Sequence, residues 1–345
     1  MNGDSRSARP SVPGSVLVMG AGAIGCYLGG CLQASGVPVT FVGRPRVLDE
    51  LRCHGLHLTD LDGRDQTVGA EDLVLHEAVP PDARPCWVLL AVKSSATEAA
   101  ARELAAALPP GMPVVSMQNG VSNAAVAQAA APGLQAIAGM VPFNVARLGA
   151  GHFHRGTDGA LAAADHPALR AWPAVFAAAG LDLALQADLR GVQWAKLLLN
   201  LNNPVNALSG LPLKAQLEDR GLRRCLAALQ QEGLDALRAA GIEPARLTPL
   251  PPRLLLRVLR LPSPLFRLVA ARMLRIDAKA RSSMAEDFDR GAATEIDALC
   301  GEVVRLAGRH GVAAPLNTKM VELIEGWPAR PQAYSGAALQ RALGI

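Results

Sequence analysis

A glycine-rich loop near the N-terminus constrains the fold more than any other part of the chain. The apolar run VLVMG ends at Gly20, and residues 20–25 read GAGAIG, which fits the pattern GxGxxG. In such a loop the first glycine permits a tight turn, the second lets the backbone approach a pyrophosphate, and the third lets a helix pack closely on a strand. The helical run CYLGGCLQASG follows, so the helix N-terminus faces the phosphates. We expect a dinucleotide site formed by Gly20, Gly22, Ala23, Ile24 and Gly25.

The first half of the chain alternates short β-type runs with helical patterns. After VLVMG come VTFVG (39–43), WVLLAV (87–92), PVVSM (113–117) and AIAGMV (136–141). This alternation predicts a parallel sheet with helices on both faces.

The second half has a different pattern. From about residue 188 long amphipathic stretches take over, and two of them end at Gly241 and Gly311, which suit helix C-caps. The predicted fold class is therefore α/β, with a Rossmann-type domain at 14–187 and an all-helical domain at 188–345. Residues 1–13 are predicted to be a disordered tail rather than a secretion signal, because the apolar stretch after them is a strand and a nucleotide loop.

Composition narrows the class of protein. Half of the 345 residues are hydrophobic and 19% are charged, which is typical of a globular chain. No apolar run reaches the roughly 18 residues that a membrane span needs. The six cysteines include no CxxC pair, so we expect a cytoplasmic protein without structural zinc.

Residues 246–281 form a basic, leucine-rich segment. It contains eight arginines and Lys279 against the single acid Asp277, a net charge of +8. Its leucines recur at helical spacing and it has almost no aromatic residues, which argues against nucleic-acid binding. We predict an amphipathic helical pair with a solvated basic face; a membrane-surface or partner-binding role is the alternative.

The end of the second predicted strand indicates which dinucleotide binds. An NAD enzyme is expected to place an acid there, whereas this chain has Gly43, Arg44, Pro45 and Arg46, with no acid before Asp49. A guanidinium matches the charge and geometry of a 2′-phosphate, so we predict NADP. Lys93 and Asn119 follow the runs WVLLAV and PVVSM, at the strand ends where open α/β sheets bind ligands.

The stretch GVQWAKLLLNLNNPVNALSG (191–210) combines the leucines of a buried helix with one lysine and four asparagines. At about 100° per residue, Asn200 lies about 40° from Lys196 and Asn203 about −20° from it, so the three share one face. We expect this stripe to face a cavity, where an ammonium group stabilises the charge that develops on a carbonyl oxygen during hydride transfer and donates a proton. The other interpretation is a snorkelling lysine whose neighbouring amides bond to another helix. Asn202 points away and is expected to be structural.

A second polar cluster lies in ARSSMAEDFDRGAATEID. It has no histidine and does not match a calcium-binding loop, so we expect no metal. From the residues alone it is a helix start capped by Thr294.

In this order and spacing, GAGAIG, VKS, QNG, KLLLNLNNPVNAL and SSM followed by TEID resemble the ketopantoate reductases (2-dehydropantoate 2-reductases) over about 15–325. That family reduces 2-dehydropantoate to pantoate with NADPH on the way to pantothenate. The resemblance implies a helical domain of the 6-phosphogluconate-dehydrogenase type and a small 2-oxo acid as substrate; a homodimer is one option. It implies Lys196 as proton donor and Glu295 as the carboxylate that holds the substrate hydroxyl and the lysine network. It further implies that Asn119, Asn200 and Ser283 bind substrate or orient the nicotinamide, and that Arg44 and Lys93 lie near the NADP phosphate and ribose.

One departure from the family pattern affects the substrate. The family often places asparagines four and eight residues after the lysine, but here the eighth position is Pro204. Either Asn203 or Asn206 then supplies the third polar group. Reduction of another branched 2-oxo acid, or an NADP-sensing protein without turnover, are the alternatives; a sensor would not need both Lys196 and Glu295.

Overall fold

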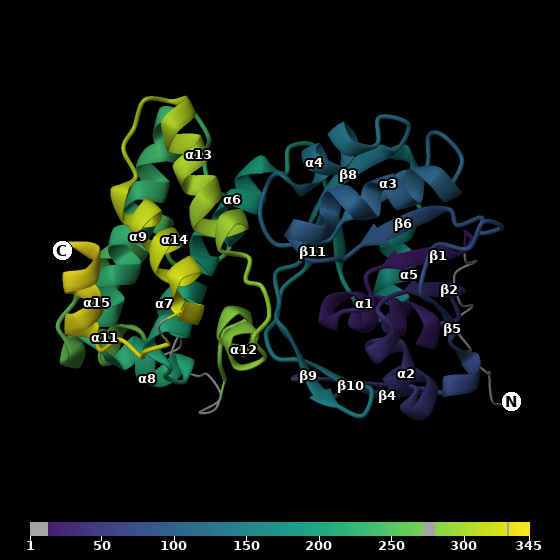
Figure 1. Cartoon of the computed structure of the whole chain (residues 1–345), viewed down its shortest axis with the longest axis horizontal. Coiled ribbons are helices and arrows are strands. Elements are labelled where there is room, and N and C mark those ends of the chain that lie inside the picture. Colours follow the sequence, from purple (N-terminus) through teal and green to yellow (C-terminus); the bar gives the residue numbers. More distant parts are fainter. Residues whose placement is uncertain (1–12, 272–279, 330) are drawn as a thin grey trace, which may run out of the picture. The chain divides into compact units, whose positions relative to one another are not determined.

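The computed structural model describes residues 13–271, 280–329 and 331–345. The tail predicted at 1–13 lies, apart from Pro13, outside the described residues. The chain divides into two units: the first contains the residues up to Gln118 and Asn123–Leu189, and the second contains Asn119–Ser122 and Arg190–Ile345. Figure 1 labels many of the elements of both units.

An eight-stranded sheet forms the centre of the first unit, in the order β12-β11-β8-β7-β6-β1-β2-β5. All neighbouring strands are parallel except β11 and β8. The predicted parallel sheet is therefore confirmed; each predicted run overlaps one of its strands, and β5, β11 and β12 were not predicted. The strands are β1 (Val16–Met19), β2 (Val39–Val42), β5 (Val74–His76), β6 (Trp87–Leu90), β7 (Pro113–Ser116), β8 (Gln135–Met140), β11 (Leu161–Ala164) and β12 (Leu183–Gln186).

Alternate residues of β1 belong to two separate cores, one on each face of the sheet. Val16 and Val18 pack with residues of α1 and α5, whereas Leu17 and Met19 pack with residues of α3 and α4. Because both faces are covered, the central strands are continuous apolar runs rather than alternating ones. The helices of this unit are α1 (Ala23–Ala34), α2 (Pro45–His54), α3 (Thr97–Ala107), α4 (Asn123–Ala130) and α5 (Trp172–Ala178), with short 3₁₀ turns η1 (Ala70–Asp72), η2 (Ser94–Ala96) and η3 (Pro167–Leu169).

The first unit also contains a small sheet that the sequence patterns did not predict. It has the order β4-β3-β10-β9 and packs against α1. Its strands carry many polar residues, because much of the sheet is open to solvent. They are β3 (Leu56–Asp60), β4 (Asp65–Val68), β9 (Val145–Gly149) and β10 (His152–Arg155).

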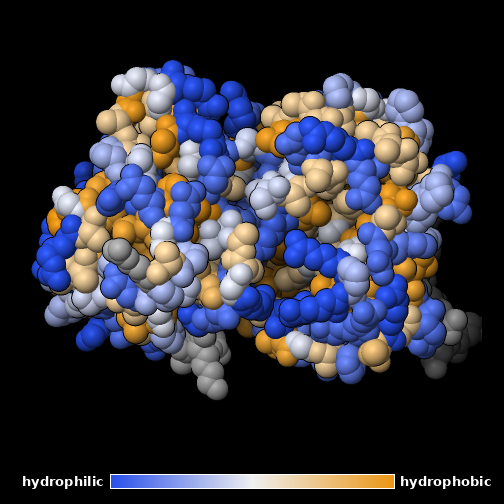
Figure 2. Space-filling view, in the orientation of Figure 1, coloured by the Kyte–Doolittle hydropathy of each residue, from blue (hydrophilic) through white to orange (hydrophobic). Residues whose placement is uncertain are grey.

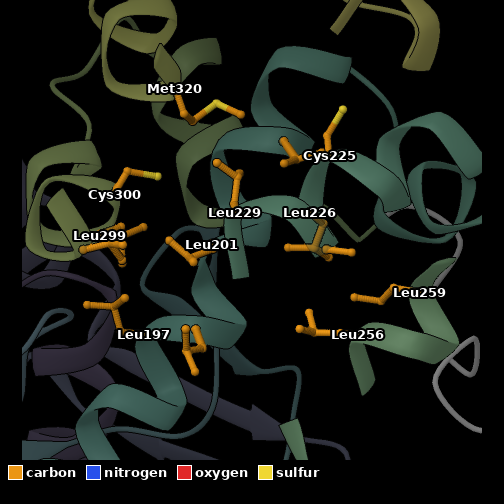
Figure 3. Packing of buried hydrophobic residues seen from close by; sticks show 14 of the residues in the cluster. Leu197, Leu201, Cys225, Leu226, Leu229, Leu256, Leu259, Leu299, Cys300 and Met320 are labelled. Atoms are coloured by element: carbon orange, nitrogen blue, oxygen red, sulfur yellow. The ribbon is translucent and has the colours of Figure 1, made fainter. Parts of the chain in front are cut away.

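The described residues of the second unit form helices joined by loops and no strands, in agreement with the predicted all-helical domain. The long helix α9 lies in its core, and Figure 3 shows Leu226 and Leu229 of α9 among leucines of neighbouring helices. Gly241 and Gly311 adopt left-handed φ angles of +66° and +68° just beyond α9 and α13, which confirms both predicted C-caps. The helices are α6 (Arg190–Asn200), α7 (Asn202–Ser209), α8 (Leu213–Glu218), α9 (Arg220–Ala239), α10 (Pro252–Arg260), α11 (Ser263–Val269), α12 (Ser283–Asp289), α13 (Glu302–Arg309), α14 (Pro315–Gly326) and α15 (Gly336–Leu343), with η4 (Asp297–Gly301) a π-helical turn and η5 (Trp327–Ala329) a 3₁₀ turn.

The stretch 191–210 is not one continuous helix, and this corrects the sequence analysis. Helix α6 ends at Asn200, and α7 begins at Asn202. Pro204 explains the break, because proline has no N–H and its ring clashes with the carbonyl group four residues earlier, here that of Asn200. The buried side chain of Gln230 donates to the Leu198 carbonyl at 2.9 Å, which satisfies an acceptor beside the break.

The predicted amphipathic pair in the basic segment consists of α10 and α11. On α10, Leu255, Leu256 and Leu259 are buried, while its arginines are exposed. Residues 272–279 of the segment lie outside the described residues. On the visible face of the molecule apolar residues are scattered among hydrophilic ones (Figure 2), as on most globular proteins. In the described part of the chain, no helix has the length and apolar character of a membrane span.

Candidate active site

The loop between β1 and α1 has the geometry expected for a dinucleotide site. Gly20 has a φ of +112°, and a Cβ there would lie 2.6 Å from the backbone nitrogen of Val92. A Cβ at Gly25 would collide with the Gly20 carbonyl oxygen, whereas one at Gly22 would meet no atom within 4 Å. The first and third glycines are therefore required for packing, and the second leaves the outer face of the loop open.

Helix α1 begins directly at this loop. Gly22 is its N-cap residue without a side-chain cap, and Ala23 and Ile24 are its first two residues. The first backbone N–H groups of a helix have no partner within the helix and carry its positive dipole end. These amides and the open face at Gly22 fit a pyrophosphate group.

Arg44 stands where the sequence places it, two residues after the end of β2. It is the N-cap residue of α2, in an extended conformation, and its side chain is exposed. The nearest following acid, Asp49, bonds to Arg52 at 2.7 Å. The end of β2 therefore presents a guanidinium group rather than a carboxylate.

A buried polar network supports the loop that carries Lys93. Gln118 accepts from Ser116 at 2.8 Å and donates to the Val92 carbonyl at 2.9 Å and to Thr97 Oγ1 at 2.8 Å. Thr97 donates to Asn123 at 3.1 Å. Sequence reasoning did not assign these residues to the site. The position of Gln118 directly before Asn119 in the run QNG could have indicated its role. The sequence around Thr97 and Asn123 did not indicate a role for either residue.

In the second unit, three of the predicted site residues form one hydrogen-bonded group. The amide nitrogen of Asn119 donates to Glu295 Oε2 at 2.9 Å, and its oxygen accepts from Asn200 Nδ2 at 3.2 Å. Asn119 thus bridges a carboxylate and a second amide that lie far from it in the sequence. Asn119 and Asn200 contribute neutral amides to the group, and Glu295 contributes a carboxylate.

Lys196 lies on α6 one helical turn before Asn200, so the two side chains share a face of the helix. Burial lowers the pKa of Lys196 from 10.5 to about 8, because desolvation disfavours the charged ammonium group. An acid with a pKa near the working pH is well matched to proton transfer. Lysines on solvated surfaces keep a pKa above 10, so this shift separates Lys196 from an ordinary surface lysine.

The structure assigns different environments to the remaining asparagines. Asn206 is fully buried; it donates to the Leu211 carbonyl at 2.9 Å and accepts from the Ser282 N–H at 2.9 Å. Asn202 accepts from Gln216 at 2.8 Å, in agreement with the structural role expected for it. Asn206 is therefore occupied by packing, which leaves Asn203 as the candidate for the third polar group.

Asn203 and Ser283 lie on α7 and α12, two helices that pack together. Ser282 links them, because its hydroxyl donates to the Asn203 carbonyl at 3.2 Å and caps α12 through the Ala285 N–H. Ser283 itself is exposed. The angular argument for Asn203 assumed one continuous helix, and it no longer applies because α6 ends at Asn200 and α7 begins at Asn202.

The predicted cap at Thr294 is wrong. The helix starts at Ile296, two residues after Thr294, and continues as the π-helical turn η4. Sequence periodicity does not register such a turn, which adds a residue to the helical repeat. Within the described ranges, no group of three or more His, Cys, Asp or Glu side chains could hold a metal ion.

Comparison with known proteins agrees with this architecture. The chain matches the family models described as "Ketopantoate reductase PanE/ApbA" over residues 16–168 and "Ketopantoate reductase PanE/ApbA C terminal" over residues 188–327. It is 29% identical over 316 residues to 2-dehydropantoate 2-reductase of Halobacterium salinarum, covering 90% of this chain and 97% of the relative.

Solved structures give the same result. A PanE/ApbA family ketopantoate reductase from Ralstonia eutropha superposes with a TM-score of 0.76 at 29% identity, over 90% of this chain and 97% of the other. D-mandelate dehydrogenase with NADH and anilino(oxo)acetate has a TM-score of 0.73 at 17% identity, over 96% and 99% of the two chains. At that identity the likeness shows the fold alone.

The Rossmann-type sheet with its glycine loop and the helical unit, together with the two family matches and the 2-dehydropantoate 2-reductase relative, define a nicotinamide-dependent oxidoreductase that acts on a keto group. The two family models together cover most of the chain. The protein belongs to the ketopantoate reductase (PanE/ApbA) family.

Proposed function

We propose that the protein reduces 2-dehydropantoate to pantoate with NADPH. The observation that carries this proposal is the arrangement in the second unit: Lys196, with its lowered pKa, lies one turn from the Asn200–Asn119–Glu295 group. A 2-oxo acid needs a proton donor for its keto oxygen and polar groups that orient it, and this arrangement supplies both.

In this proposal, residues 14–187 bind NADP and residues 188–345 carry the residues that act on the substrate. Bound NADPH supplies the hydride for the keto carbon. Gly20, Gly22 and Gly25 shape the loop for the pyrophosphate, and the first amides of α1 contact its oxygens. Arg44 pairs with the 2′-phosphate, which favours NADP over NAD. Lys93 contacts the ribose side of the cofactor.

Lys196 stabilises the negative charge that develops on the keto oxygen and then donates its proton to that oxygen. Because its ammonium is partly desolvated, it loses the proton more readily than a surface lysine does. Glu295 accepts a hydrogen bond from the substrate hydroxyl, and Asn119 holds the Glu295 carboxylate in place. Asn200, Asn203 and Ser283 bind the substrate.

A second candidate is the reduction of another branched 2-oxo acid. Pro204 favours it, because this residue stands where the family often has an asparagine and it ends α6 at Asn200. The chemistry would be the same, with a differently shaped substrate.

The test is NADPH oxidation measured with a panel of 2-oxo acids that includes 2-dehydropantoate. We expect 2-dehydropantoate to give the highest kcat/KM, and a place among the poorest substrates would refute the assignment. Tight NADPH binding without turnover of any 2-oxo acid would support a sensor instead.

The role of Lys196 has its own test. Lys196→Ala should lower kcat by at least about 100-fold, the usual scale for loss of an acid catalyst. Lys214, an exposed lysine of α8, provides the matched control, and Lys214→Ala should retain the wild-type rate. A near-normal rate for Lys196→Ala would exclude it as the proton donor.

A further inference from the structure

A second contact joins the Asn119 segment to the helix that follows Glu295. Three residues after Asn119, the Ser122 hydroxyl donates to Glu302 Oε1, and Glu302 lies seven residues after Glu295. Glu302 is only 3% exposed. Segment Asn119–Ser122 is therefore attached to the helical unit at both of its ends, through Asn119 and through Ser122.

Arg305 connects this second contact back to Glu295. Its Nη2 lies 3.2 Å from Glu302 Oε1 and donates to the Asp297 carbonyl at 2.7 Å, while its Nη1 lies 2.6 Å from Asp297 Oδ1. Asp297 is the first residue of η4, two residues after Glu295. These side-chain contacts and the short backbone segments between them form a closed ring, which passes through Asn119, Glu295, Asp297, Arg305, Glu302 and Ser122.

Gly301 lies against the Asp297–Arg305 part of this ring. A Cβ at Gly301 would collide with Asp297 Oδ1 and lie 3.3 Å from Arg305 Nη1. A π-helical turn is rare, and such turns occur frequently at functional sites. Here the turn lies directly between Glu295 and Glu302.

A buried carboxylate is costly unless its charge is paired and hydrogen-bonded, so Glu302 needs the Ser122 hydroxyl and the Arg305 guanidinium.

The contact between Ser122 and Glu302 also limits the movement of segment Asn119–Ser122. Gln118 and Asn123, on either side of the segment, belong to the first unit, so the chain leaves that unit for only four residues. Ser122 therefore gives the segment a second attachment point beside the bonds of Asn119 to Glu295 and Asn200, and this second point restricts the movement of Asn119 relative to the Glu295 carboxylate.

We propose that Ser122, Glu302 and Arg305 are positioning residues, which hold Asn119 against Glu295 and thereby orient the carboxylate for the substrate. This inference rests on the proposed reductase function. None of the three residues needs to contact the substrate, the cofactor or the reacting atoms. Their effect on the reaction passes through Asn119 and Glu295.

The test compares Ser122→Ala and Glu302→Gln with the control Glu322→Gln, which alters an exposed glutamate of α14. The first two variants should lower kcat about tenfold and leave the KM for NADPH within about twofold, since the segment belongs to the helical unit. The control should behave as the wild type. Ser122→Thr keeps the hydroxyl and should restore most of the rate.

A double-mutant cycle separates positioning from a general structural role. In an Asn119→Ala background, Ser122→Ala should cause almost no further loss of kcat, because its effect passes through the missing amide. If Ser122→Ala lowers kcat tenfold in both backgrounds, or in neither, the proposal is wrong. Ser122→Ala removes only one oxygen atom, so this cycle does not depend on whether the Glu302 variant folds.

Amide hydrogen exchange tests the positioning role without relying on reductase activity. If the wild type reduces no 2-oxo acid, the reductase proposal fails, and the ring can still be examined in the intact protein. Exchange at the amides of residues 119–122 should be about tenfold faster in Ser122→Ala than in the wild type, because the segment opens more often. Unchanged exchange would overturn the positioning role.

Discussion

Replacing Lys196 by methionine should stabilise the protein and abolish its activity. Methionine fills a similar volume with a flexible, uncharged side chain. The fall in the pKa of Lys196 from 10.5 to about 8 corresponds to a cost of about 3 kcal/mol for holding the ammonium in the folded state. Lys196 keeps some contact with solvent, so we expect Lys196→Met to raise the free energy of unfolding by about 2 kcal/mol at pH 7.

The gain should depend on pH in a defined direction. The folded state binds the Lys196 proton more weakly than the unfolded state does, so the cost is complete below about pH 8 and is lost as the pH rises to 10.5. At pH 10 only about a quarter of the cost remains. The stability difference between Lys196→Met and the wild type should therefore shrink between pH 7 and pH 10.

The assay is urea unfolding at both pH values, together with kcat for the reduction. Lys214→Met, at an exposed position of α8, is the control and should change neither quantity. A stability gain of the same size at both pH values would show that burial of the charge is not its source. If Lys196→Met is no more stable than the wild type at pH 7, the claim that burial of the Lys196 ammonium destabilises the folded state is wrong.

Three further predictions concern the cofactor loop and the proton donor. With the wild type, kcat for the reduction should fall as the pH rises through about 8, because Lys196 loses the proton it must donate; a rate that stays constant to pH 10 would contradict this role. Arg44→Ala should raise the KM for NADPH at least tenfold more than that for NADH, since only NADPH carries the 2′-phosphate, and equal increases in both KM values would overturn the phosphate assignment. Gly25→Ala should lower the thermal unfolding temperature, because its Cβ would collide with the Gly20 carbonyl oxygen. Gly22→Ala should leave that temperature unchanged and weaken dinucleotide binding measured by calorimetry; equal unfolding temperatures for the two variants would argue against the packing of this loop.

Local sequence patterns predicted most of the architecture. The apolar runs that become β1 and β6 are recognisable because both strands are buried along their whole length and continuously apolar, and β2, β7 and β8 are mostly apolar. Glycine chemistry identified the nucleotide loop and the ends of α9 and α13, since left-handed φ angles and close backbone contacts leave few alternatives to glycine.

The small sheet β4-β3-β10-β9 was missed because its strands are short, polar and partly open to solvent, so their pattern is that of loops. Pro204 indicates the break at Leu201, because proline interrupts a helix. The angles calculated from Lys196 assumed an uninterrupted helix. The apolar spacing of the sequence did not indicate the π-helical turn η4, in which Asp297 contacts Arg305.

The sequence by itself determined the class of fold, the dinucleotide loop and the identities of Lys196 and Asn119 as candidates. These conclusions depend on residue types and on spacings of a few residues, which act through local backbone geometry. Glu295 became a candidate only through the resemblance to the ketopantoate reductases. Only the tertiary structure decided that Asn119 bonds to Glu295, 176 residues away, and that Asn206 is used for packing. It also decided the lowered pKa of Lys196, because desolvation is a property of the packed surroundings and not of the side chain.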